Sequence, residues 1–245
     1  MSEMRKEYMW QLVFRCVVFM LCVGLCLLKP EQFSILPGMM FFDHLSVLHL
    51  LWLLWVIDMI YQIIPLKNKV ALGSQKLFAN RFRPIREKIN REALRHYVTT
   101  TTKAAYKVMV LWVALIAALG VLYYRDIIGP LGLFLFCVAF YVCDLICVLV
   151  WCPFRLIMKN KCCTTCRIFN WDHIMMFSPL IFVGGFFCWS LFILSAVAWL
   201  VWEVFVMLYP ERFWEMSNVA LQCSACTDKL CTQYCQKLRR KRKML

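Results

Sequence analysis

Cysteine is the residue type best able to do chemistry in this 245-residue sequence, which contains 15 of them. Eight lie within apolar runs or end one, where a free thiol behaves as a small hydrophobe. The other seven lie in polar stretches, and two pairs form C-x-x-C turns: Cys163 with Cys166, and Cys223 with Cys226. Two such turns can complete a tetrahedral sulfur site. We therefore predict that these four cysteines bind a structural zinc ion.

Other arrangements of the same residue types stay open. Cys231 and Cys235 follow Cys226, so the tail alone offers four thiols, which could hold zinc or an iron–sulfur cluster. Cys162 and His173 flank the first turn and are alternative ligands. The thiols could also be unpaired or lipid-modified, or could form disulfides if the tail lies outside the cell.

Charged residues within the apolar runs form a second set of candidates. Asp58 and Asp144 are the clearest cases, Arg15 could pair with either, and Glu203 lies in the last apolar run. Because charge in hydrocarbon is costly, each is either part of a structural ion pair or part of a transport or proton pathway. The sequence favours neither reading.

Histidine offers weaker signals. His44 and His49 point about 140° apart on a helix and do not readily share one ion. Binding of haem or a metal ion by these histidines is the weaker interpretation. We expect instead that Asp43 caps the helix and that His44 lies among lipid headgroups.

The stretch Asn170-Trp171-Asp172-His173 has two readings. Asp172 and His173 could support the cysteine site. Alternatively, Asn170 or Asp172 caps the next helix and Trp171 anchors it at the membrane interface.

The amino-acid composition indicates that these residues are positioned by membrane-spanning helices. Apolar residues make up 62% of the chain, and mean hydropathy is +0.67, well above the values of soluble domains. The apolar residues fall in runs of about 20, the length that crosses a bilayer. The fold class is therefore all-α: a polytopic transmembrane helix bundle. The first run has a long core and no small-residue cleavage site, so we expect a transmembrane helix and not a signal peptide.

The apolar runs cover residues 10–28, 41–64, 106–124, 131–152 and 174–209. The last run is long for one span, and we expect it to enter and return with a bend at Gly184-Gly185, giving about six spans, or four plus a re-entrant hairpin. The competing reading is one tilted span. The predicted divisions are 1–66, a transmembrane hairpin; 67–105, a basic amphipathic segment; 106–152, a second hairpin; 153–173, a Cys-rich loop; 174–209, the returning hairpin; and 210–245, a Cys-rich basic tail.

The formal net charge of +14 is concentrated between the apolar runs. This position excludes nucleic-acid binding as the main reading and predicts that both termini and the segments 67–105 and 153–167 are cytoplasmic, in a plasma or inner membrane. Helical spacing of Ile85, Ile89 and Leu94 predicts a separate amphipathic helix, either lying on anionic headgroups or packed on the bundle.

Common catalytic motifs are missing, so an enzyme activity stays uncertain. Three functions remain. The first is a membrane scaffold or assembly factor with a structural zinc, whose basic surface docks anionic lipid or an acidic protein partner. The second is a transporter of ions or small solutes that uses the intramembrane carboxylates. The third is a redox protein with an iron–sulfur or haem centre.

Overall fold

The computed structural model describes residues 3–39, 41–42, 45–64, 72–86, 89–160, 162–226 and 230. All regular elements in this part of the chain are helices, which confirms the all-α class. The five long helices are α1 (Glu3–Leu28), α2 (Val47–Ile63), α4 (Arg91–Tyr124), α5 (Pro130–Leu149) and α8 (Gly185–Leu208). Short helices are α3 (Leu72–Gln75), α6 (Phe154–Met158) and α7 (Asp172–Phe177). Six 3-10 turns join them: η1 (Pro30–Ile35), η2 (Ala79–Arg81), η3 (Cys163–Thr165), η4 (Ser178–Phe182), η5 (Pro210–Arg212) and η6 (Val219–Leu221).

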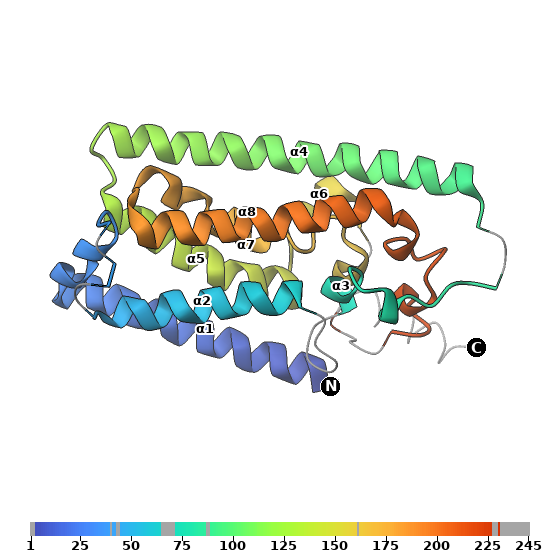
Figure 1. Ribbon diagram of the computed structural model, residues 1–245, viewed down its shortest axis with the longest axis horizontal. Helices are drawn as coiled ribbons and strands as arrows, with labels where there is room; N and C mark the ends of the chain where they lie inside the picture. The colour runs from blue at the N-terminus through green and yellow to red at the C-terminus, as the bar shows by residue number, and fades with distance from the viewer. Residues whose placement is uncertain are drawn as a thin grey trace.

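The long helices lie side by side in an elongated bundle (Figure 1). Four of them, α1, α4, α5 and α8, are long and apolar enough to cross a membrane, and α2 is a shorter apolar helix. Large apolar side chains such as Leu50 and Val110 point outward. A water-soluble surface would not expose them in continuous bands. The four long apolar helices and this exposed apolar surface are those of a membrane protein by length and composition.

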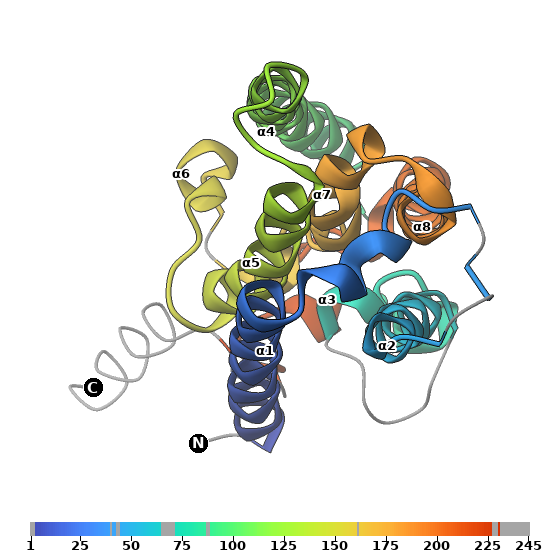
Figure 2. The ribbon, with the colours of Figure 1, turned by 90° about the vertical axis from the view of Figure 1, so that its left-hand side faces the viewer.

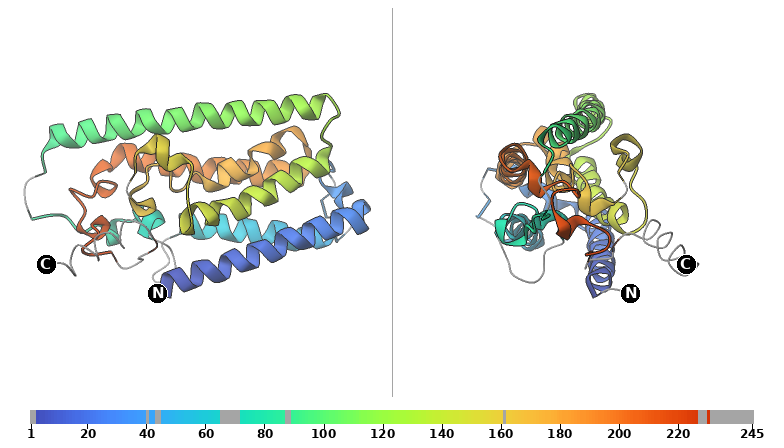
Figure 3. Two further views of the ribbon diagram at one scale, coloured as in Figure 1. Left: turned by 180° about the vertical axis from the view of Figure 1, so that it is seen from behind. Right: turned by 90° about the vertical axis from the view of Figure 1, so that its right-hand side faces the viewer.

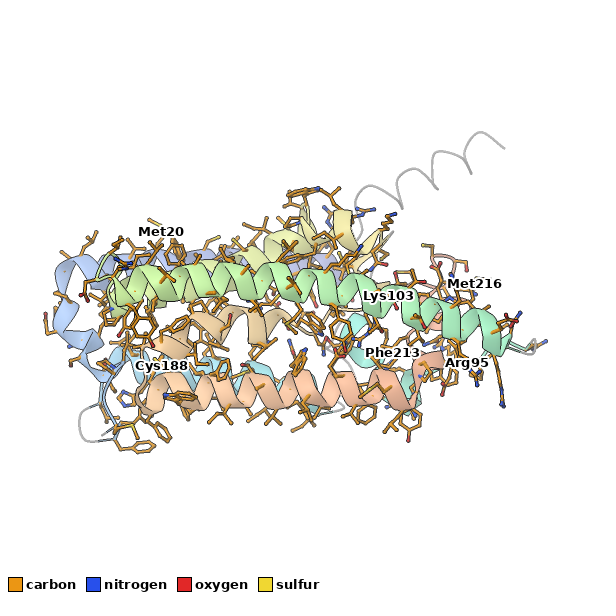
Figure 4. All side chains as sticks on the ribbon, turned by 90° about the horizontal axis from the view of Figure 1, so that it is seen from above. Met20, Arg95, Lys103, Cys188, Phe213 and Met216 are labelled. Carbon is orange, nitrogen blue, oxygen red and sulfur yellow. The ribbon has the colours of Figure 1, made fainter. Side chains whose placement is uncertain are left out.

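The bundle has two distinct ends. At one, called the turn end, lie η1, the loop that joins α4 to α5, and the start of α8 (Figures 1 and 2). The other, called the tail end, carries residues 72–86, 162–171 and 210–226. It is held by hydrogen bonds such as that from Arg212 Nη1 to the Leu77 carbonyl at 3.0 Å. Figure 4 shows the same division, with Met20 and Cys188 toward the turn end and Arg95, Phe213 and Met216 at the tail end.

The chain reverses at Gly184 and Gly185, where the bend was predicted. Both glycines have positive φ, 78° and 75°, which side chains on L-residues rarely adopt. A Cβ on Gly185 would lie 2.2 Å from the Leu36 carbonyl oxygen, so this turn packs directly on the residues that follow η1. The 174–209 stretch therefore folds back on itself at these two glycines. Its first limb is an irregular run of α7 and η4, and its second limb is the long helix α8.

Two helix starts differ from the prediction. Helix α2 begins at Val47 and not at residue 41, because the Ser46 hydroxyl accepts a hydrogen bond from the Leu48 N–H. Helix α4 begins at Arg91, after an Asn90 side chain that accepts from two backbone N–H groups, and runs without a break to Tyr124. The predicted amphipathic helix is thus no separate element, and its second half extends α4 beyond the span (Figure 3).

An aromatic core fills the bundle between the charged residues described below and the turn end. Trp55 is fully buried and packs against the rings of Phe134, Phe177 and Phe187. Edge-on and tilted contacts of this kind are the favourable ones for aromatic rings. This core leaves the charged residues on the tail-end side of Trp55.

Candidate functional site: a buried charged cluster

The charged residues of the apolar runs meet in one group, called the Arg15 cluster. It consists of Arg15 from α1, Asp58 and Gln62 from α2, Asp144 from α5, and Asp172 and His173 from α7. Four helices therefore supply its members.

Arg15 joins three of these helices. Its Nη1 atom donates to Asp144 Oδ2 at 2.8 Å and to the Tyr141 carbonyl at 2.7 Å. Its Nη2 atom lies 3.6 Å from Asp58 Oδ2. The guanidinium also stacks 4.0 Å from the centre of the Tyr141 ring. The predicted pairing of Arg15 with one aspartate is thus a contact with both.

His173 lies between two carboxylates. Its Nε2 atom is 3.4 Å from Asp58 Oδ2 and its Nδ1 atom is 3.3 Å from Asp172 Oδ2. The side chain is only 4% exposed. Gln62 donates from its amide to Asp172 Oδ2 at 2.9 Å. Asp172 and His173 are therefore members of this cluster.

The cluster carries an excess of negative charge. Three carboxylates face one arginine and one histidine, so the sum is −1 with His173 protonated and −2 with it neutral. Three buried atoms of the cluster have no hydrogen-bond partner: the acceptor oxygens Asp172 Oδ1 and Gln62 Oε1, and the ring nitrogen His173 Nδ1. Buried acceptors without partners are costly, so this arrangement favours binding of a proton or a water molecule.

The cluster separates two cavities. Arg15 and Asp58 line one of about 210 Å³ between α1 and α2, together with Gln11 and Tyr61. Asp144 and Asp172 line a second, largely apolar cavity of about 250 Å³ between α4, α5 and α7. Asp58 is the most exposed carboxylate of the cluster, at 37%. The row Asp58, His173, Asp172 therefore leads from one cavity to the other.

Glu203 belongs to a different group, called the Lys76 cluster: Lys76, Arg167, Trp171, Trp202 and Glu203. Arg167 forms a two-pronged ion pair with Glu203, with one bond of 2.8 Å from Nη1. The indole of Trp171 donates to the same carboxylate at 2.8 Å. Glu203 therefore lies in a different cluster from Asp58 and Asp144.

Lys76 lies in this second cluster without a carboxylate of its own. It is 2% exposed, donates to the Cys166 carbonyl at 3.0 Å, and lies 5.1 Å from the centre of the Trp202 ring. Burial lowers the pKa of Lys76 to about 7, and the nearby Arg167 charge adds to the effect. The burial of Lys76 and Arg167 was not predicted, because both residues lie in basic segments that were expected to face lipid headgroups.

The remaining polar candidates have structural roles. His49 Nδ1 accepts from the Ser46 N–H at 2.9 Å, and Nε2 donates to the Phe41 carbonyl at 2.6 Å, so His49 completes the cap of α2. Asp43 and His44 lie outside the described residues. Helix α7 begins after Trp171 with no side-chain cap. Trp171 is 2% exposed, so it is a core residue and not an interface anchor.

The cysteines do not assemble as predicted in the part of the chain that the structure describes. Cys163 and Cys166 line the 250 Å³ cavity, whereas Cys223 and Cys226 lie in the turn after η6. Within the described ranges, no three His, Cys, Asp or Glu side chains are grouped to hold a metal ion. The thirteen cysteines in the described ranges form no disulfide with one another, and Cys162 Sγ lies 3.5 Å from the Thr164 hydroxyl. Cys231 and Cys235 lie outside the described residues, and the zinc and iron–sulfur readings stay predictions.

Comparisons with known proteins add no function to this geometry. No family model, no curated protein and no solved structure matches the chain. The Arg15 cluster is therefore the feature on which a functional reading depends.

Proposed function

We propose that this protein passes protons through the Arg15 cluster of a polytopic membrane bundle. The observation that carries the proposal is the position of His173, with each ring nitrogen beside a carboxylate that lines a different cavity. Polar residues buried within a membrane bundle and lining cavities are typical of proton and ion pathways.

The relay needs only these three side chains. A proton on Asp58 passes to Nε2 of neutral His173, and the proton on Nδ1 passes to the Asp172 carboxylate. Reorientation of the ring restores the starting tautomer. Arg15 offsets part of the negative charge and holds Asp58 and Asp144 in place.

The aromatic core separates the Arg15 cluster from the turn end of the bundle. Phe177 lies one turn after His173, with ring centres 6.2 Å apart, and packs on Trp55. Protons therefore reach the cluster from the two cavities and meet an apolar barrier toward the turn end. Net transport then requires this barrier to open, as in alternating access.

We further propose that the tail end is cytoplasmic. The described basic residues Arg81, Arg83, Arg155 and Arg212 lie there, whereas the turn end carries Lys29 and Arg125. Lys and Arg concentrate on the cytoplasmic side of membrane proteins. These charges would also attract anionic headgroups.

The test is proton flux into liposomes that contain the purified protein and a trapped pH-sensitive dye. With potassium and valinomycin to balance charge, the protein should speed the decay of an imposed pH gradient. Asp58→Asn should reduce this flux at least tenfold, whereas Glu92→Gln, on the exposed first turn of α4, should not change it. A wild-type rate equal to that of empty liposomes would reject the proposal.

A further inference from the structure

The 250 Å³ cavity has a composition that the proton pathway does not explain. Five cysteines line it: Cys143, Cys147, Cys152, Cys163 and Cys166. Aromatic and methionine side chains from α4, α5 and α7 complete walls that are almost wholly apolar. Such a cavity fits an aliphatic chain better than a polar ligand, because it offers few hydrogen-bonding groups. We call it the thiol cavity.

Cys152 differs from the other four cysteines in its position. It lies just beyond α5, which ends at Leu149, and is half-buried. The neighbouring Val150 and Trp151 are 63% and 53% exposed, so their side chains face outward at this boundary of the span. Exposed tryptophans are typical of the membrane–water interface. Cys152 therefore lies where the thiol cavity meets the headgroup region at the tail end.

The chemistry of the Cys152 thiol supports this distinction. A hydrogen bond with the Cys147 thiol lowers the pKa of Cys152 to about 7, and the backbone N–H groups of Phe154 and Arg155 contribute. Burial raises the pKa of Cys166, at the tail end of the same cavity. Since the thiolate is the nucleophile, Cys152 is the more reactive of these two thiols.

We propose that Cys152 carries a long-chain fatty-acyl group in thioester linkage and that this chain occupies the thiol cavity. The donor is an acyl thioester of the acyl-coenzyme A class. Cys152 Sγ attacks the acyl carbonyl carbon, a new carbon–sulfur bond forms, and the bond to the coenzyme A sulfur breaks. The Cys152 proton ends on the coenzyme A thiol, so no oxidant or reductant is needed.

Acylation would also affect the charged cluster, a consequence that rests on the proposed proton function. Asp144 and Asp172 line the same cavity, so an acyl chain there would exclude water from their side of the cluster. The acylated protein should then conduct protons more slowly than the thiol form. Acylation itself does not depend on the cluster and is measured without any flux assay.

The first test locates the acyl group. The full-length protein is isolated from membranes of cells that contain S-acyltransferases, and its peptides are examined by mass spectrometry before and after hydroxylamine. We expect a hydroxylamine-sensitive fatty-acyl mass on the peptide that contains Cys152. Cys152→Ser should lose most of the label, whereas Cys16→Ser, at an exposed position on α1, should keep it. An unmodified wild-type Cys152 peptide would overturn the proposal even if Cys152→Ser does not fold.

The second test locates the chain. A fatty acid with a photoreactive group near its tail is incorporated in cells, and the crosslinked products are mapped after irradiation. Crosslinks to Phe140, Met175 or Met176 place the chain in the thiol cavity. Crosslinks to phospholipid alone would overturn that part of the proposal. Filling the cavity by Val148→Phe should reduce the cavity crosslinks several-fold while the Cys152 thiol remains.

Discussion

The Arg15 cluster has more negative than positive groups, and the Lys76 cluster has more positive than negative groups. The first has three carboxylates against Arg15 and His173, and two acceptor oxygens and His173 Nδ1 have no hydrogen-bond partner there. The second has Lys76 and Arg167 against Glu203, and the atom left without a partner is a donor, Arg167 Nε. Burial alone therefore does not identify a candidate proton site. Access matters as well, because the Arg15 cluster lines two cavities and the Lys76 cluster is packed among Trp171, Trp202 and Phe213.

Removing the Glu203 carboxylate should give the largest loss of stability. Glu203→Gln leaves Arg167 and Lys76 buried without an anion, and breaking a buried ion pair in this way costs about 3–5 kcal/mol. We expect a Tm well below that of the wild type in detergent. A shift as small as that of Glu92→Gln, at an exposed position, would show that the Lys76 cluster does not hold the tail end together.

The pH dependence of stability should follow Lys76. Its folded-state pKa of about 7 is below the unfolded value of about 10.4. Between these two pH values the unfolded chain therefore binds more protons than the folded chain. Stability should therefore rise with pH across this window, since the cost of burying the charge is greatest below about pH 7.

Lys76→Met isolates this effect. The variant should be more stable than the wild type by a few kcal/mol at pH 6, and the difference should vanish near pH 10. Tm measured for both proteins across this range checks the expectation. If the difference in Tm between the two proteins did not change with pH, Lys76 would titrate as an exposed lysine does, and its burial would not lower its pKa.

Neutralising a carboxylate of the Arg15 cluster should have the smallest effect on stability. Asp172→Asn removes one negative charge from a cluster that has an excess, and the new amide can still accept from Gln62. We expect Tm to change by an amount equivalent to about 1 kcal/mol or less. A loss as large as that of Glu203→Gln would erase the difference between the two clusters and favour a purely structural Arg15 cluster.

Sequence reasoning found the helices and part of this site. Long apolar runs were enough to find the long helices, and the cost of charge in hydrocarbon was enough to bring Arg15, Asp58 and Asp144 together. The position of His173 beside Asp58 was not predicted, because α7 is a short helix in an irregular limb and no periodicity placed its residues beside α2. The start of α4 was missed because Thr99–Lys103 is polar, although nothing in it breaks a helix.

The zinc prediction shows a different limit. The 174–209 stretch folds back on itself, and the segments that carry the two C-x-x-C turns both lie at the tail end. Sharing an end does not bring side chains to bonding distance, because Cys166 is held beside Lys76 and faces the thiol cavity. Spacing along the chain could not foresee that packing.

The most direct test of the proton relay is chemical rescue of His173. His173→Ala removes the ring between Asp58 and Asp172 and should reduce proton flux in liposomes at least tenfold. Added imidazole can occupy the space and carry the proton, so it should restore a large part of the flux in His173→Ala and leave the slow rate of Asp58→Asn unchanged. Undiminished flux in His173→Ala, or a loss that imidazole does not reverse while Tm stays at the wild-type value, would contradict the relay.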